Sequence, residues 1–313
     1  MKLVIWAVGI LICVTIGLVW MTKRELTRAE QAFPPAGEFV AVEGHQVHYI
    51  DQGSGPAVIL IHGASGNLRD WTFSMVGRLA ERYRVLAFDR AGHGYSDRPA
   101  DGYDPAVQGR LIAKAARKLG VEQAILVGHS FGCAPALAIA LDDPDLAAGL
   151  VDVAGASHPW DGSLSIRYPL SFNPLTSWAL RTVASLISEE KLVDPVFEPQ
   201  ATPEGYIEHI GVKLALRPST FRHNAEDVLR LNESLKRMSP RYPTLKLPVE
   251  ILHGSLDDVV TESISPRGVE RDVPHDRFTL LDGVGHMPHH VAEDEIVAAI
   301  DRLAMEAFGE VTQ

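Results

Sequence analysis

Short apolar runs alternate with longer amphipathic stretches along most of the chain. Four runs are branched, apolar and only four or five residues long, as expected of strands buried on both faces: 57–61, 84–88, 124–127 and 150–154. Three stretches between them have helical periodicity: 70–83, 104–119 and 134–141. Strands that alternate with helices predict an α/β fold, with a mostly parallel sheet covered by helices on both faces.

The alternation begins and ends with recognisable elements. Glu38–Val42 and Gln46–Asp51, joined by a turn at Glu43-Gly44, predict an antiparallel pair at the start of the sheet. Strand patterns return at 249–252 and 277–281, and an amphipathic helix over 290–308 closes the chain. We therefore expect the sheet domain to comprise residues 38–156 and 243–313.

Between these two parts, over 157–242, the alternation stops. Helix-like pieces broken by prolines take its place: Ser177–Ile187, Pro203–Leu216 and Ser219–Met238. This segment is predicted to be a helical cap inserted into the sheet domain. Its apolar side chains predict an apolar substrate pocket under the cap: Trp160, Leu164, Trp178, Leu180, Val183, Leu186, Phe197 and Tyr206.

The N-terminal 21 residues differ in character from the rest. Leu3 to Met21 carries no charge and is close to the ~20 residues that cross a bilayer as a helix. Residues 1–21 are therefore predicted to be an uncleaved single-pass membrane anchor, or an uncleaved signal, followed by a linker over 22–37. Lys23, Arg24 and Arg28 favour a cytoplasmic catalytic domain. Met1-Lys2 before an apolar run also resembles an export signal, so both sides stay open.

Composition narrows the classes of partner. The 313 residues carry a formal net charge of −11 and show no basic stripe, which disfavours nucleic acid. A small molecule is the expected partner. The sequence gives no indication of an oligomeric state.

The most informative stretch is the pentapeptide Gly128-His129-Ser130-Phe131-Gly132. It lies between a predicted strand and a predicted helix, which is the context of a nucleophile elbow. The serine takes a strained backbone conformation there, and the two glycines allow close approach of neighbouring backbone. Ser130 is therefore the candidate nucleophile, and His129 fills the variable position.

A serine hydroxyl needs a base within reach and an acid that orients the base. In the chain order that accompanies this elbow, the acid comes next and the histidine last. Asp257 and His286 both follow predicted strand ends and are the candidate acid and base, with Asp258 as the rival acid. His289 and His290 are read as the start of the final helix rather than as metal ligands beside His286.

A developing oxyanion needs two converging backbone N–H donors. One is expected from Phe131, directly after the nucleophile. Ala64 is the candidate for the second, because it follows His62-Gly63 at the end of a predicted strand.

Taken together, these motifs make the chain similar to the capped, esterase-like serine hydrolases of the α/β-hydrolase fold family, from about Phe39 to the C-terminus. The motifs occur in the family's order: His62-Gly63-Ala64, Asp89-x-x-Gly92-x-Gly94-x-Ser96, Gly128-x-Ser130-x-Gly132, Gly254-x-x-Asp257 and Gly285-His286. In that family Asp89 and Gly92–Ser96 are scaffold residues of a tight loop. The stretch Asp89–Pro99 also resembles haloalkane dehalogenases and epoxide hydrolases, but both use a carboxylate where this chain has Ser130. Ala64 also lacks the side chain with which dehalogenases hold halide.

The resemblance implies a serine hydrolase that forms an acyl-enzyme and needs no cofactor and no metal. Hydrolysis of a carboxylic ester or a similar acyl substrate is the leading hypothesis. Two alternatives use the same catalytic triad of Ser130, His286 and Asp257: C–C bond hydrolysis and cofactor-free peroxidation. A third alternative is a membrane-tethered binding module without catalysis.

Overall fold

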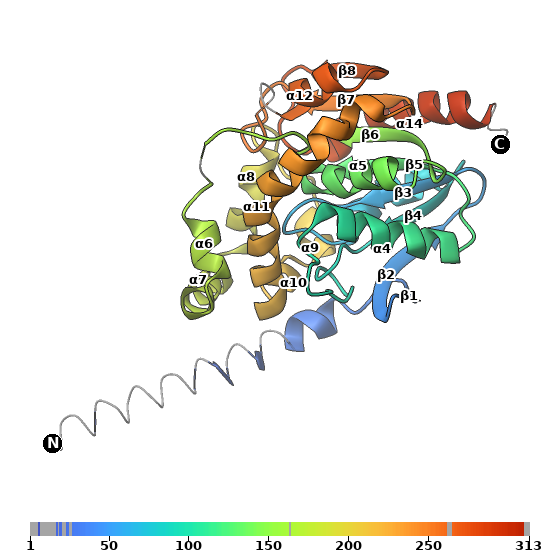
Figure 1. The fold of residues 1–313 in the computed structure, drawn as a ribbon. Coiled ribbons are helices and arrows are strands. Elements are labelled where there is room, and N and C mark those ends of the chain that lie inside the picture. The colour runs from blue at the N-terminus through green and yellow to red at the C-terminus, as the bar shows by residue number, and fades with distance from the viewer. Residues whose placement is uncertain are drawn as a thin grey trace.

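The computed structural model describes residues 6, 17, 19–20, 23–24, 27–162, 164–261 and 265–309. Eight strands form one sheet in the order β1-β2-β4-β3-β5-β6-β7-β8 (Figure 1). Their bounds are β1 Glu38–Val42, β2 His45–Gln52, β3 Ala57–Ile61, β4 Arg84–Phe88, β5 Ala124–His129, β6 Ala147–Val153, β7 Val249–Gly254 and β8 Asp276–Leu281. The pairs β1–β2 and β2–β4 are antiparallel and all others are parallel. The predicted α/β fold and the antiparallel start are confirmed.

Helices cover both faces of this sheet, because alternate residues of each central strand point to opposite sides. In β3, Ile59 and Ile61 pack in one cluster with α4 Pro105–Lys118 and α5 Cys133–Asp142. Val58 and Leu60 of the same strand pack on the other face, against helices that flank the sheet there. The helices on this second face are α2 Arg69–Thr72, α3 Met75–Leu79 and α14 Glu293–Phe308. Burial on both faces explains the uninterrupted apolar runs of the sequence.

Three helices that the sequence pattern predicts as continuous are interrupted. The stretch 70–83 divides into α2 and α3, because Ser74 lies outside the helical region at φ −145°. The stretch 203–216 divides at Gly211, which has φ +65°. The last helix divides at Ala292, with φ −139°, into α13 Pro288–Val291 and α14. Apolar periodicity continues across each break, so the pattern conceals it.

Six helices lie between β6 and β7 in the sequence, in the segment predicted to be a cap. They are α6 Arg167–Phe172, α7 Pro174–Leu186, α8 Glu189–Phe197, α9 Tyr206–Ile210, α10 Val212–Ala215 and α11 Pro218–Met238. A further helix that the pattern did not reveal, α12 Ser265–Asp272, follows β7. In Figure 1 the six helices gather at one side of the sheet.

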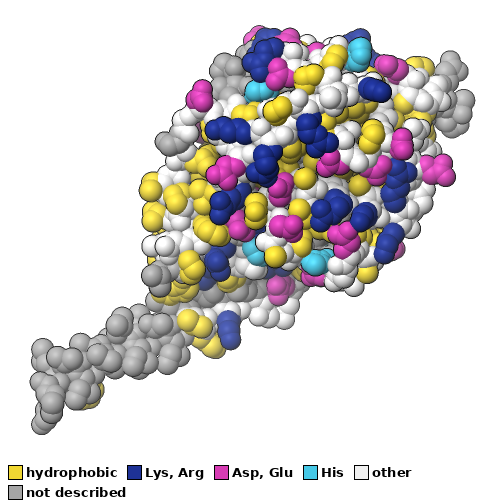
Figure 2. Space-filling view, viewed as in Figure 1, with side chains coloured by type: hydrophobic (Ala, Val, Ile, Leu, Met, Phe, Trp, Pro, Cys, Tyr) yellow, Lys and Arg dark blue, Asp and Glu magenta, His cyan; other side chains and the backbone are white. Residues whose placement is uncertain are grey.

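Part of the apolar surface of this segment faces outward. Val183 is 57% exposed and Leu186 is 78% exposed, whereas Phe197 and Tyr206 are buried. Figure 2 shows hydrophobic side chains gathered over α6 and α7, while charges of both signs are mixed over much of the same face. Helix α7 therefore presents Val183 and Leu186 to the outside, and these two side chains do not line an enclosed pocket.

The expected membrane anchor falls mostly on residues outside the described part of the chain. Within the described part, no helix combines the length and the apolar character needed to span a bilayer. The anchor over 1–21 remains a prediction from the sequence.

Candidate active site

Ser130 lies at the sharp turn between β5 and α5, as the sequence predicts. Its φ is +52°, in the left-handed region that non-glycine residues rarely adopt. A Cβ added to Gly132 would come within 2.2 Å of the Ile61 carbonyl oxygen, and one on Gly128 within 2.6 Å of the Cys133 nitrogen. Both positions therefore exclude any side chain. The flanking glycines allow the strained turn, and the turn places Ser130 beyond the end of the sheet.

The structure brings the predicted nucleophile, base and acid together. His286 Nε2 lies 3.0 Å from Ser130 Oγ, and His286 Nδ1 lies 2.8 Å from Asp257 Oδ2. All three residues are buried, and they come from the loops after β5, β7 and β8. If the Nδ1 proton is donated to Asp257, Nε2 keeps a lone pair directed at the serine hydroxyl, as a general base requires.

Backbone contacts decide between the two candidate acids. Asp257 Oδ1 accepts hydrogen bonds from the Val259 and Val260 amides at 2.8 and 2.9 Å, which fixes the carboxylate and directs Oδ2 at His286. Asp258 is exposed, and the carboxylate that contacts His286 is that of Asp257. The geometry therefore favours Asp257 over its neighbour.

The two proposed oxyanion donors lie on either side of the nucleophile. Phe131 is the second residue of the short 3₁₀ turn Ser130–Gly132, whose first amides have no partner in a preceding turn. A Cβ added to Gly63 would lie 3.2 Å from Ser130 Cβ, so the loop after β3 runs directly against the serine. Among the described residues, the Ala64 amide donates no hydrogen bond. Both residues therefore lie next to the nucleophile, and their role as oxyanion donors stays a prediction.

Apolar side chains pack around this end of the site. One cluster joins the buried Phe131 and Ala134 to Leu231 and Leu235 of α11. The partly buried Ala64, Ala156 and Trp160 pack against the same cluster. Because Phe131 and Ala64 belong to the cluster, the surroundings of the nucleophile on this side are hydrocarbon. Such surroundings suit an apolar group of a substrate.

A second group of ionisable side chains, which the sequence did not reveal, lies beside the catalytic histidine. Asp70 accepts hydrogen bonds from His289 Nε2 at 3.1 Å, His290 Nε2 at 2.8 Å and the Tyr206 hydroxyl at 2.7 Å. The His129 ring packs between those of His286 and His289, with centroid separations of 5.1 and 4.1 Å. We call Asp70, His289 and His290 the Asp70 cluster. It was missed because a contact between residues 219 positions apart leaves no local pattern.

Charge in the Asp70 cluster follows from its burial and contacts. Burial alone would raise the pKa of Asp70, but His289 and His290 hold that pKa well below its usual range. Burial, followed by the neighbouring His290, lowers the pKa of His289 to about 4 against the opposing effect of Asp70. At neutral pH the cluster is a carboxylate that accepts hydrogen bonds from a neutral imidazole of His289 and from its other partners.

The same three residues form the one group within the described chain whose spacing could hold a metal ion, with ligand atoms within 4.8 Å of one another. Their contacts fit a metal poorly. A metal on Nε2 would leave the proton on Nδ1, yet Nδ1 of both His289 and His290 lacks a partner among the described residues. Metal-bound histidines nearly always donate that second proton. Hydrogen bonds to Asp70 explain the cluster without a metal.

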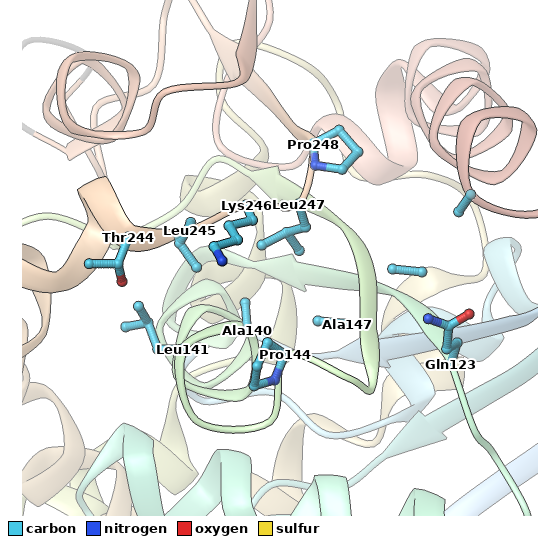
Figure 3. Close-up of a pocket in the computed structure, with 12 residues that line it drawn as sticks. Gln123, Ala140, Leu141, Pro144, Ala147, Thr244, Leu245, Lys246, Leu247 and Pro248 are labelled. Carbon is cyan, nitrogen blue, oxygen red and sulfur yellow. The ribbon is translucent and has the colours of Figure 1, made fainter.

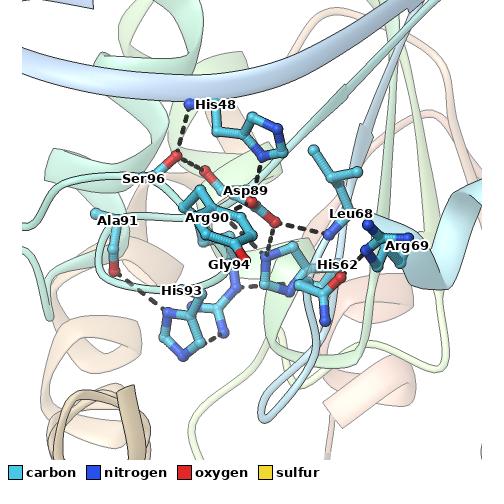
Figure 4. Close-up of polar contacts among 12 residues, drawn as sticks. His48, His62, Leu68, Arg69, Asp89, Arg90, Ala91, His93, Gly94 and Ser96 are labelled. Carbon is cyan, nitrogen blue, oxygen red and sulfur yellow. Dashed lines mark hydrogen bonds and ion pairs between the residues drawn. The ribbon is translucent and has the colours of Figure 1, made fainter. Parts of the chain in front are cut away.

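The loop after β4 has the scaffold role that the resemblance implies. Asp89 accepts hydrogen bonds from the amides of Leu68 and Tyr95 at 2.7 and 2.8 Å and contacts His48 Nδ1 at 2.6 Å (Figure 4). A Cβ on Gly94, which has φ +48°, would collide with the Asp89 carboxylate. Asp89 thus ties the loops after β3 and β4 together and sets the position of the loop that carries Ala64.

A surface hollow of about 450 Å³ occurs near the amino ends of the parallel strands β5, β6 and β7 (Figure 3). Its lining includes Gln123, Ala147 and Pro248, which directly precede or begin β5, β6 and β7. The triad lies at the opposite, carboxyl ends of these strands, where parallel sheets bind their ligands. The hollow is therefore not the candidate active site.

Comparisons with known proteins agree with this architecture. A family model described as alpha/beta hydrolase fold matches residues 56–293. An uncharacterised protein of Mycobacterium tuberculosis is 26% identical over 304 residues, covering 90% of this chain and 84% of the relative. The 2-hydroxymuconate semialdehyde hydrolase of Pseudomonas putida is also 26% identical, covering 89% of this chain and 98% of the enzyme.

Among solved structures, a bacterial membrane phospholipase A superimposes with a TM-score of 0.68 and 23% identity, covering 97% of this chain and 99% of that one. This likeness shows a shared fold. The family match extends over about three quarters of the sequence, from before β3 to the start of α14. The chain therefore belongs to the alpha/beta hydrolase fold family.

Proposed function

We propose that the protein hydrolyses carboxylic esters through an acyl-enzyme on Ser130, with His286 as general base and acid and Asp257 as its orienting carboxylate. The observation that carries this proposal is the unbroken hydrogen-bonded chain Ser130–His286–Asp257, with distances of 3.0 and 2.8 Å. Hydrolases among the relatives support an enzyme rather than a binding module.

The reaction follows from the geometry. His286 Nε2 takes the proton of the Ser130 hydroxyl while Oγ forms a bond to the ester carbonyl carbon. The carbonyl oxygen becomes an oxyanion, which the amides of Ala64 and Phe131 would stabilise. The imidazolium then gives its proton to the departing alkoxide, which leaves as an alcohol. A water molecule repeats the sequence on the acyl-enzyme, releasing the acid and free Ser130.

An ester fits the site better than a C–C bond does. An alkoxide leaving group needs one proton, and His286 can supply it. A carbanion leaving group needs further polar stabilisation beside the bond that breaks, whereas the buried cluster of Phe131, Leu231 and Leu235 next to the nucleophile is apolar. The Pseudomonas putida relative, named as a semialdehyde hydrolase, keeps C–C hydrolysis as the second candidate.

A substrate panel tests the proposal. Purified protein is assayed with p-nitrophenyl esters of increasing acyl length and with ring-cleavage products that undergo C–C hydrolysis, with Ser130→Ala as the control. We expect turnover of the esters, dependence on acyl length and loss of turnover in the control. Turnover of C–C substrates alone would replace the first candidate by the second, and unchanged ester turnover in Ser130→Ala would remove Ser130 from the mechanism.

We also propose, from the sequence, that residues 1–21 anchor the protein in a membrane by a single span. The support is the uncharged apolar run Leu3–Met21 between basic flanks. Alkaline carbonate extraction of cells that express the full chain tests this. The anchor predicts that the chain stays in the pellet, and complete release into the supernatant contradicts it.

A further inference from the structure

The loop that carries the Ala64 amide rests on one fully buried arginine. Arg90 Nε donates to the His62 carbonyl and Arg90 Nη2 donates to the Gly63 carbonyl, both at 3.0 Å. Arg90 and His62 have no exposed surface. The Gly63 carbonyl and the Ala64 N–H belong to the same peptide group. A cation held on that carbonyl fixes the plane of the peptide and polarises its N–H toward the nucleophile.

His62 completes the support of this peptide. The Arg90 backbone amide donates to His62 Nε2 at 3.0 Å, so the imidazole proton is on Nδ1, which lies 2.9 Å from the Gly63 carbonyl oxygen. Burial, followed by the charge of Arg90, lowers the pKa of His62 to about 4. The ring is thus neutral and donates to the same oxygen as Arg90, so both lone pairs of that carbonyl are occupied.

Arg90 also reaches the second proposed oxyanion donor. Its guanidinium carbon lies 4.3 Å from the centroid of the Phe131 ring, within the range of a cation–π contact. One side chain therefore contacts both the Gly63–Ala64 peptide, through its carbonyl oxygen, and the ring of Phe131. Figure 4 shows Arg90 between His62 and His93 in the loops after β3 and β4.

The counterion of Arg90 comes from the predicted cap. Arg90 Nη1 lies 2.9 Å from Asp227 Oδ2, and neither side chain has exposed surface. Asp227 lies on α11, the helix whose Leu231 and Leu235 pack on Phe131. The same helix contributes Asn224, whose Oδ1 accepts from the Ser65 amide at 2.6 Å. Helix α11 is therefore connected to the loop of Ala64 at two points.

We propose that Arg90 is a positioning residue of the oxyanion hole, holding the Gly63–Ala64 peptide against Ser130 and coupling it to helix α11 through Asp227. This inference rests on the proposed acyl-enzyme function. Lysine can keep the charge at position 90, but it cannot serve the carbonyls of His62 and Gly63 and the carboxylate of Asp227 in the fork geometry of a guanidinium.

Arg98 offers a matched control. Its Nη1 donates to the other oxygen of Asp227 at 2.8 Å and its Nη2 donates to Glu226 at 2.8 Å, so it belongs to the same buried ionic network. Arg98 Nη1 also donates to the Ala91 carbonyl at 3.3 Å, and this hydrogen bond does not involve the loop of Ala64. Arg98→Lys therefore perturbs the network and leaves the proposed support of the oxyanion donors in place.

The experiment compares Arg90→Lys with Arg98→Lys, using a short p-nitrophenyl ester and a trifluoromethyl ketone that forms a tetrahedral adduct with the serine. Active sites are titrated with a fluorophosphonate, so that a smaller folded fraction changes the titre and not the kcat per site. For Arg90→Lys we expect kcat per site to fall about 100-fold, KM to change by about threefold or less and the ketone Ki to rise in proportion. For Arg98→Lys we expect both kcat per site and Ki to stay within about threefold.

Equal kcat and Ki in the two lysine variants would overturn the inference. If Arg90→Lys does not fold, Asp227→Asn replaces it, because Arg90 then loses its counterion while Ser65, Leu231 and Leu235 are unchanged. A normal ketone Ki in Asp227→Asn would likewise overturn the inference. Ser130→Ala is assayed in parallel: turnover in that variant refutes the proposed function, whereas an inactive Ser130→Ala beside a normal Arg90→Lys refutes only the role of Arg90.

Discussion

Two histidines three residues apart in the chain, His286 and His289, each contact a buried aspartate, but only His286 also contacts a serine hydroxyl. His286 has Asp257 on Nδ1 and Ser130 on Nε2. His289 has Asp70 on Nε2, while its Nδ1 has no partner in the described structure. A carboxylate on one nitrogen orients an imidazole, but catalysis also needs a nucleophile at the other. The comparison separates the pair that we propose to be catalytic from one that organises the interior.

The largest predicted difference comes from replacing each histidine by glutamine. His286→Gln removes the base, and kcat on a p-nitrophenyl ester should fall on the order of 10⁵- to 10⁶-fold. His289→Gln keeps a side-chain N–H for Asp70 and should change kcat by less than about tenfold. Steady-state kinetics with active-site titration measure both. Comparable losses in the two variants would show that the distinction between the pairs is wrong.

The two acids should differ in the property that they control. Asp257→Asn disturbs the tautomer and the orientation of His286, so kcat should fall about 10⁴-fold. Asp70→Asn removes a charged acceptor shared by three donors, so the free energy of unfolding should fall by about 2 to 3 kcal/mol with a much smaller loss of kcat. Guanidinium unfolding beside kinetics makes the comparison. A catalytic loss in Asp70→Asn as large as that in Asp257→Asn would contradict it.

Acid should destabilise the fold through His289. Its pKa is about 4 in the folded chain, so the unfolded chain, with an ordinary value near 6.5, binds more protons between these limits. The contribution of His289 to the free energy of unfolding is therefore complete above pH 6.5 and is lost as the pH falls toward 4. At pH 5 the loss from this residue is about 2 kcal/mol. Urea unfolding at pH 7.5 and pH 5 measures the loss, which should shrink in His289→Gln. An unchanged pH dependence in that variant would exclude His289 as the cause.

The smallest expected effect is that of added metal. Because Asp70 already accepts hydrogen bonds from both histidines, Zn²⁺ should leave Tm unchanged within about 1 °C. A metal site would instead raise the free energy of unfolding by about 2.7 kcal/mol at a Zn²⁺ concentration 100 times its Kd. Thermal unfolding with Zn²⁺ and with a chelator, on wild type and Asp70→Asn, provides the measurement. A saturable rise in Tm that Asp70→Asn removes would show that the Asp70 cluster is a metal site.

Much of the candidate triad could be predicted because each member lies directly after a strand. Strands of a parallel sheet bring their carboxyl ends to one edge, so local patterns around Ser130, Asp257 and His286 are enough to bring them together. The glycines of the elbow are informative for the same reason. Their role depends on backbone within a few residues of Ser130 and on the adjacent strand β3.

The supports of the site could not be predicted in this way. Arg90 and Asp227 meet across 137 positions, and Asp70 meets His289 across 219. Each contact depends on where a helix outside the strand pattern packs, and local sequence patterns do not predict that position. The helix breaks at Ser74 and Ala292 were not predicted for a related reason. Tertiary contacts, and not apolar periodicity, decide where such breaks fall.

Peptide mapping after reaction with a fluorophosphonate tests the central claim most directly. The account predicts one phosphonyl adduct per chain, on Ser130, that is absent in Ser130→Ala and forms far more slowly in His286→Gln. An adduct on another residue in wild type, or labelling of His286→Gln at the wild-type rate, would contradict the claim that His286 activates Ser130.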